Sequence, residues 1–217
     1  MKTFAFVPTI IALILILGTH AASATDKYTE TMLKNITAVY SANSIDDLQK
    51  VVNTFDRIGE AEKDKWEPYY YSAFGNIMMC TREADPAKKD AFLDLAIKAI
   101  EKAKELAPNE AELAALEGFV HMMRVTIDPA TRGQQYSGLA MQAFNKALTI
   151  SPENPRATIL LAQMQFGTAQ FFGSPTTDAC ATASKAVEKF DSFKSENLLA
   201  PQWGKGMADD MVKKCQN

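Results

Sequence analysis

The stretch Gly138–Pro152, GLAMQAFNKALTISP, decides the fold because its pattern occurs twice in the chain. Within it, small and bulky apolar residues follow the spacing A-x3-F-x2-A-x4-P, at Ala140, Phe144, Ala147 and Pro152. The same frame occurs upstream at Ala96, Ile100, Ala103 and Pro108. Small residues at helical spacing let one helix pack closely on another, and a proline ends the helix. The sequence therefore predicts an internal repeat built from helices.

The first 24 residues have the features of an export signal. Lys2 precedes an apolar run from Phe4 to Gly18, which leads to Ala22-Ser23-Ala24. A run of this length with a small-x-small site is typical of a secretory signal peptide, whereas a spanning helix needs roughly 20 apolar residues. An uncleaved N-terminal anchor is the alternative. We expect cleavage after Ala24, a periplasmic or secreted location, and a single domain over residues 25–217.

The composition argues against two classes of partner. The chain carries 23 basic and 26 acidic residues, a formal net charge of −3, and the two signs are mixed along the sequence. No basic stripe is present that would neutralise phosphates, so nucleic acid is not an expected partner. No second long apolar run follows the signal segment, so we expect no membrane span once the signal is removed.

Three cysteines, Cys80, Cys180 and Cys215, remain after the signal. Export would place them where disulfides persist, and the odd number leaves at least one unpaired within the chain. We expect a disulfide between Cys180, at the start of the last repeat's second helix, and Cys215, in a final helix that should dock there. Three buried free thiols are the alternative, because free cysteine is a common small core residue.

Apolar periodicity and capping residues divide the chain into helix pairs. We expect pairs at about 26–58, 66–108, 109–152 and 153–195, followed by a cap over 198–217. Helix starts are predicted at Ser44, at Asp85-Pro86, at Asn109 and at Asn154-Pro155. Two long connectors between paired helices are also predicted, Thr81–Lys89 and Ile127–Tyr136, and a third, shorter one at Gln170–Pro175.

The first helices of these pairs carry a second pattern. Tyr71, Phe74, Gly75 and Met78 occupy the positions of W-x2-L-G-x2-Y, and Gly118 matches Gly75 in the next pair. With these motifs the chain, over Trp66 to Phe190, resembles a divergent, exported bacterial form of the tetratricopeptide-repeat (TPR) family. The resemblance implies an all-α fold: a right-handed stack of antiparallel helix pairs, a TPR-like α-solenoid, with a C-terminal capping helix. It also implies that the first helices line a concave groove used for partners.

Matching the family register places a group of mostly Met, aromatic and polar side chains in that groove: Tyr69, Asn76, Met79, Phe119, Met122, Met123, Arg156, Gln163 and Phe166. Thioethers and flat rings suit a surface that accepts varied apolar side chains of a protein or peptide. The alternative is that Phe119, Met122 and Met123 only fill the core. The predicted connectors offer a second candidate surface, at Arg132, Tyr136, Phe171 and Phe172.

The sequence offers little for catalysis or metal binding. It lacks H-E-x-x-H, G-x-S-x-G and a Gly-rich phosphate loop, and His121 is the only histidine after the signal segment. We expect no enzyme activity, no metal and no cofactor. The leading hypothesis is an exported helical-repeat scaffold that binds a protein or peptide in the concave Met/aromatic groove. The alternatives are a carrier of an apolar small molecule or lipid held among Phe119, Met122, Met123 and Phe166, or a structural part of an envelope assembly.

Overall fold

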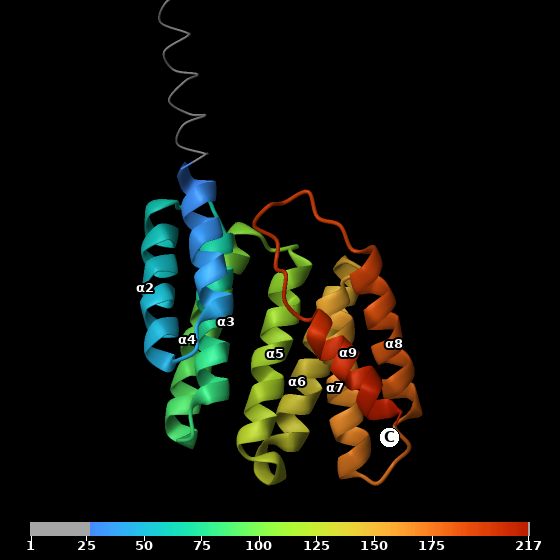
Figure 1. Cartoon of the computed structure of the whole chain (residues 1–217). Helices are drawn as coiled ribbons and strands as arrows, with labels where there is room; N and C mark the ends of the chain where they lie inside the picture. Colours follow the sequence, from blue (N-terminus) through green and yellow to red (C-terminus); the bar gives the residue numbers. More distant parts are fainter. Residues whose placement is uncertain (1–26, 217) are drawn as a thin grey trace, which may run out of the picture.

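The computed structural model describes residues 27–216, and every regular element in this range is a helix. The expected signal segment, residues 1–24, lies outside the described residues. Figure 1 shows the helices standing side by side in an array. In order they are a helix over residues 27–41, α2 (Ile45–Ala61), α3 (Glu67–Arg82), α4 (Pro86–Leu106), α5 (Ala111–Ile127), α6 (Pro129–Ile150), α7 (Pro155–Phe171), α8 (Thr177–Ser192) and α9 (Lys205–Cys215).

Each helix packs chiefly on its neighbours in sequence, with α3 against α4, α5 against α6 and α7 against α8. The all-α array of helix pairs expected from the repeat frames is therefore confirmed. Within residues 27–216 no helix is both long enough and apolar enough to cross a membrane.

Short polar side chains start several of these helices. The side chains of Ser44, Asp85 and Asn154 each accept a hydrogen bond from a backbone N–H of the first turn, at 3.1, 2.8 and 2.8 Å. Each bond satisfies a backbone donor that has no partner inside the helix. At α5 the prediction is off by one residue, because Glu110 is the cap in place of Asn109.

The long connectors predicted from the sequence are wrong. Only three residues separate α3 from α4, and Asp128 alone separates α5 from α6. Asp128 accepts a hydrogen bond from the N–H of Thr131 at 3.2 Å, and Pro129 follows it in the first turn, where a missing N–H costs little. The chain consequently starts a new helix at once, so Arg132 and Tyr136 lie inside α6.

The repeat frames form the core. Their small and bulky positions, Ala96, Ile100, Ala103, Ala140, Phe144 and Ala147, are all buried. Gly118 is required by close packing, since a Cβ there would lie 2.4 Å from the ring of Phe144 in the partner helix. A Cβ on Gly75 would lie 2.4 Å from Val52 of α2, so this glycine serves contact with the preceding pair.

The C-terminal part of the chain returns over the array. After α8, residues 193–204 run back toward α5, and α9 then crosses in front of α7 and α8 (Figure 1). Ala208 and Met211 of α9 complete an apolar cluster with Ile159 of α7 and Ala183 of α8. The expected disulfide between Cys180 and Cys215 is present and joins the two helices. Helix α9 is thus the capping helix of the array.

Candidate functional site

The residues predicted for the concave groove are mostly covered. Five of them are buried: Asn76, Met79, Phe119, Arg156 and Phe166. The other four are half-buried: Tyr69, Met122, Met123 and Gln163. The expectation of an open groove at all nine positions is therefore wrong for the buried five, whereas their predicted role in partner binding stays a prediction.

A segment of the same chain, residues 198–204, covers two of these five buried residues, Phe119 and Arg156. The indole of Trp203 stacks on Phe74 and on Phe119, with ring centroids 5.3 and 5.7 Å apart and interplanar angles of 26° and 30°. The indole N–H donates to the hydroxyl of Tyr70 at 3.0 Å. An aromatic slot formed by α3 and α5 thus holds a tryptophan from the C-terminal segment.

The backbone of this segment is bound by side chains of the array. The hydroxyl of Tyr71 donates to the carbonyl oxygen of Leu199 at 2.6 Å. The N–H of Gln202 donates to the hydroxyl of Tyr40 at 3.1 Å. Burial raises the pKa of Tyr71, so its phenol stays protonated and able to donate. The array therefore binds residues 198–204 through main-chain groups as well as through the indole of Trp203.

A buried ion pair lies next to the slot. The guanidinium of Arg156 donates from Nε to Oε2 of Glu112 at 2.7 Å and from Nη2 to Oε1 at 2.8 Å. Burial opposes the charge on Arg156, but the bonds and charge of Glu112 outweigh it, so the pKa of Arg156 is raised. A further bond at 3.4 Å reaches the carbonyl oxygen of Trp203. Arg156 therefore joins α7, α5 and the C-terminal segment.

The four residues proposed for an apolar carrier site do not come together. Phe119, Met122 and Met123 belong to the main core cluster, whereas Phe166 packs in the separate cluster formed with α8 and α9. The amine of Lys214 on α9 lies 4.4 Å from the centroid of the Phe166 ring. A cavity enclosed by all four side chains, as the carrier alternative required, is therefore not what the structure forms.

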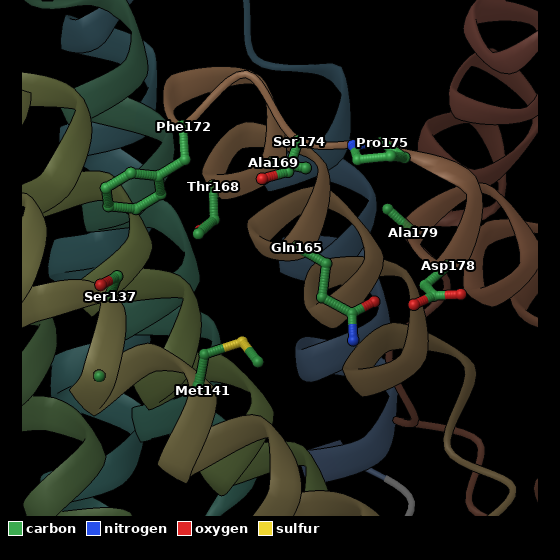
Figure 2. Close-up of a pocket in the computed structure, with 11 residues that line it drawn as sticks. Ser137, Met141, Gln165, Thr168, Ala169, Phe172, Ser174, Pro175, Asp178 and Ala179 are labelled. Atoms are coloured by element: carbon green, nitrogen blue, oxygen red, sulfur yellow. The ribbon is translucent and has the colours of Figure 1, made fainter.

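A pocket lies elsewhere, between α6, α7 and the start of α8 (Figure 2). Its volume is about 400 Å³, within the range of small-molecule sites. In Figure 2 the thioether of Met141 and the amide of Gln165 face each other across it, with the ring of Phe172 at one end. The lining residues are Ser137, Gly138, Met141, Gln165, Thr168, Ala169, Phe172, Ser174, Pro175, Asp178 and Ala179.

Two features of this pocket suggest a ligand. Oε1 of Gln165 is buried and has no hydrogen-bond partner among the described residues, although buried polar atoms are normally bonded. Phe171, the last residue of α7, and Phe172, which follows it, are 67% and 72% exposed, far more than the other large apolar side chains of α7. Their rings meet edge to face at 5.1 Å. A buried polar atom without a hydrogen-bond partner and an exposed aromatic ring therefore line the same pocket.

Sequence reasoning found only part of this pocket. Phe172 was a predicted connector residue and does line it, and Phe171 lies beside it as the last residue of α7. Met141 was already placed on a helix, within Gly138–Pro152, but no pattern marked it or Ser137 as a binding residue. The Asp-Pro start of α6 is the signal that would have extended this helix back over Ser137.

The other two connector candidates have a structural role. Arg132 binds the carboxylate of Asp90 with both terminal nitrogens, at 2.7 and 2.8 Å, and so ties α6 to α4. The bonds from Arg132 lower the pKa of Asp90. Tyr136 packs against α5, where its ring stacks on His121 at 6.0 Å and lies 5.6 Å from the guanidinium carbon of Arg124. Neither residue lines the pocket.

His121 and Cys80 are isolated titratable groups. Burial lowers the pKa of His121, and its Nδ1 has no hydrogen-bond partner among the described residues. Cys80 is a buried free thiol whose pKa is raised by burial. In the part of the chain that the structure describes, no three His, Cys, Asp or Glu side chains are grouped so as to hold a metal ion.

Comparison with solved structures finds proteins whose fold is similar to that of this chain. The HusA haemophore from Porphyromonas gingivalis superimposes with a TM-score of 0.78 and 27% sequence identity, over 87% of this chain and 92% of that one. TTC0263, a TPR protein of Thermus thermophilus, superimposes with a TM-score of 0.56 and 14% identity, over 94% and 97% of the two chains. No protein-family model and no curated protein matches the sequence. The likeness to the TPR protein confirms the TPR-like α-solenoid fold.

Proposed function

We propose, from the likeness to a haemophore, that this chain is a non-enzymatic carrier of haem or a related tetrapyrrole, bound at the pocket between α6, α7 and α8. The observation that carries the proposal is the pocket itself, of about 400 Å³, next to two exposed phenyl rings. Flat aromatic side chains suit the face of a flat apolar ring, and exposed apolar groups on a protein surface often mark a binding site.

The lining residues are compatible with such a ligand. Met141 carries a thioether, which is one of the side-chain groups that ligate haem iron. No lysine or arginine lines the pocket, and Asp178 brings a negative charge to its edge. Carboxylates of the ligand are therefore best placed in solvent, with the apolar part of the ring against Met141 and Phe172.

Haem titration of the chain over residues 25–217, followed by the Soret absorbance, tests this proposal. Replacing Phe172 by Ala removes apolar contact worth about 1.5–3 kcal/mol, so the affinity should fall about tenfold or more. Leu95→Ala is the matched control, because Leu95 is 47% exposed on α4 and does not line the pocket. Absence of a Soret change, or equal affinities for the two variants, overturns the proposal.

The second candidate function is binding of a protein or peptide on the concave face, as expected from the sequence. The observation in its favour is that the array already binds residues 198–204 of its own chain through main-chain hydrogen bonds and an indole slot, one wall of which is Phe119. TPR-like arrays are suited to this use, since their first helices line a continuous concave surface.

Export to the periplasm or the cell exterior belongs to the same proposal. The Cys180–Cys215 disulfide supports it, because disulfides persist in oxidising compartments. The signal-like sequence at residues 1–24 points the same way. Finding the uncleaved chain in the cytoplasm, with residues 1–24 still attached, would contradict this part of the proposal.

A further inference from the structure

One face of the array binds residues 198–204 of the same chain, partly through groups of that segment that another chain could also supply. Two of the hydrogen bonds to this segment use backbone atoms, the carbonyl oxygen of Leu199 and the N–H of Gln202. A third, weaker bond joins Arg156 to the carbonyl oxygen of Trp203. Main-chain bonds are independent of side-chain identity, so another segment whose backbone follows the same course can make them.

The specific element of this contact is the indole slot. The rings of Phe74 and Phe119 flank Trp203, and the hydroxyl of Tyr70 accepts its N–H at 3.0 Å. A phenyl ring would fill the slot without making this hydrogen bond, and an aliphatic side chain would lose the stacking as well. The slot therefore favours a tryptophan.

The segment is held in place at both ends. Its N-terminal end continues from α8, and its C-terminal end enters α9, where Cys215 is bonded to Cys180 of α8. Lys205 at the start of α9 also pairs with Asp191 of α8. Two covalent anchors keep the local concentration of the segment high, so a separate peptide competes poorly while both are intact.

We infer that the face formed by Tyr40, Tyr70, Tyr71, Phe74, Phe119 and Arg156 is a binding site for a tryptophan-bearing segment of a protein partner. Residues 198–204 are its internal occupant, and the Cys180–Cys215 bond controls whether they are exchanged. This inference rests on the second candidate function, peptide binding at the concave face. It is independent of the pocket between α6, α7 and α8.

Release of residues 198–204 from this face requires reduction of the Cys180–Cys215 disulfide by a dithiol. The dithiol supplies two electrons and two protons, the S–S bond between Cys180 and Cys215 breaks, each sulfur becomes a thiol, and the dithiol becomes a disulfide. Helix α9 is then held by noncovalent contacts alone, among them its apolar packing, the exposed Lys205–Asp191 pair and Lys214 over the ring of Phe166. An external segment with a tryptophan now competes with residues 198–204 on more equal terms.

A labelled peptide with the sequence of residues 198–204, LLAPQWG, provides the probe, and its fluorescence anisotropy reports binding. We expect the folded Cys180→Ala/Cys215→Ala variant to bind it about tenfold or more tightly than the oxidised wild type. Dithiothreitol should raise binding to the wild type and leave the double variant unchanged. The same peptide with Ala in place of its Trp is the matched control and should bind to neither protein.

A second variant keeps the test valid if loss of the disulfide disturbs the fold. Trp203→Ala retains the disulfide and empties the slot, so the peptide should bind it more tightly than it binds the wild type. If the oxidised wild type and the double variant bind the peptide equally, the claim that the disulfide regulates exchange of residues 198–204 is overturned. Peptide binding at this face is still supported by that result. Binding by none of the three proteins overturns both the inference and the second candidate function.

Discussion

Arg156 and Glu112 form a two-pronged ion pair inside the array, with N–O distances of 2.7 and 2.8 Å and side chains only 2% and 8% exposed. Asn154, the cap of α7, donates to the same carboxylate at 2.7 Å. The pair therefore links the start of α7 to the start of α5 through fully bonded charged groups. Because Arg156 also contacts the C-terminal segment, the same residues stabilise the repeat stack and position its internal occupant.

Removing one partner of this pair should lower the free energy of unfolding. Arg156→Met leaves the carboxylate of Glu112 buried without its counter-charge, which is expected to reduce the free energy of unfolding by about 3–5 kcal/mol. Urea unfolding followed by circular dichroism measures the loss. Lys50→Met, at the exposed pair with Asp47, is the control and should cost at most about 0.5 kcal/mol. A loss below about 1 kcal/mol for Arg156→Met contradicts the structural role given to the pair.

The close approach of α5 and α6 at Gly118 leads to a second prediction. A Cβ at this position would lie 2.4 Å from the buried ring of Phe144, so Gly118→Ala should destabilise the protein by about 1–3 kcal/mol. Gly133 is also helical, but a Cβ there meets nothing within 4 Å. Gly133→Ala should therefore raise stability by about 0.5–1 kcal/mol through better helix propensity. Shifts of the same sign in the two thermal midpoints would refute this explanation.

The sequence was informative where short-range patterns determine structure. Both repeat frames predicted buried faces, and their small and bulky positions are buried. The caps at Ser44, Asp85 and Asn154 were readable because one side chain and one nearby N–H suffice to form them. The pairing of Cys180 with Cys215 followed from the expectation that a final helix docks on the last repeat.

The covering of the groove was not predictable in the same way. The family register predicts that Phe119 and Arg156 lie on the concave face. It does not predict which other residues cover them. Trp203 and Leu199 belong to a stretch with no helical periodicity, interrupted by Pro201 and Gly204, and they meet the array through contacts far apart in sequence. No local pattern encodes such a contact. From the sequence alone, a residue that would bind a partner therefore looks the same as one that contacts a distant part of its own chain.

Loss of the disulfide should lower stability even where the fold persists. The bond closes a loop between residues 35 apart, for which restriction of the unfolded chain corresponds to about 3–4 kcal/mol. We expect dithiothreitol to lower the urea midpoint of the wild type and to leave that of Cys180→Ala/Cys215→Ala unchanged. A midpoint of the wild type that does not respond to reductant would show that the bond is absent in solution or contributes nothing.

Cys80 should behave as a protected thiol. It is buried on α3, and burial raises the pKa of its thiol, which reduces the fraction of reactive thiolate. In the oxidised protein we expect a thiol reagent to label one cysteine in denaturant and to react far more slowly under native conditions. Rapid native labelling that Cys80→Ala abolishes would contradict the burial of this residue.

His121 should make the protein less stable in mild acid. Burial holds its pKa below the ordinary value near 6.5, so the unfolded chain binds a proton more readily than the folded chain does. The neutral ring therefore contributes stability that is fully present above the unfolded pKa and is lost as the pH falls through the folded pKa. The charges that act on it are Glu117, which raises its pKa, and Arg124 and Lys104, which lower it.

Comparison with His121→Gln isolates this effect, because the carboxylates that also titrate in acid are common to both proteins. Urea midpoints measured from pH 7.5 down to pH 5 should fall more steeply for the wild type than for the variant. The variant removes the only histidine of the described residues, so any difference in slope over this range belongs to His121. Parallel pH profiles for the two proteins would mean that the ring takes up its proton as easily in the folded chain as in the unfolded one.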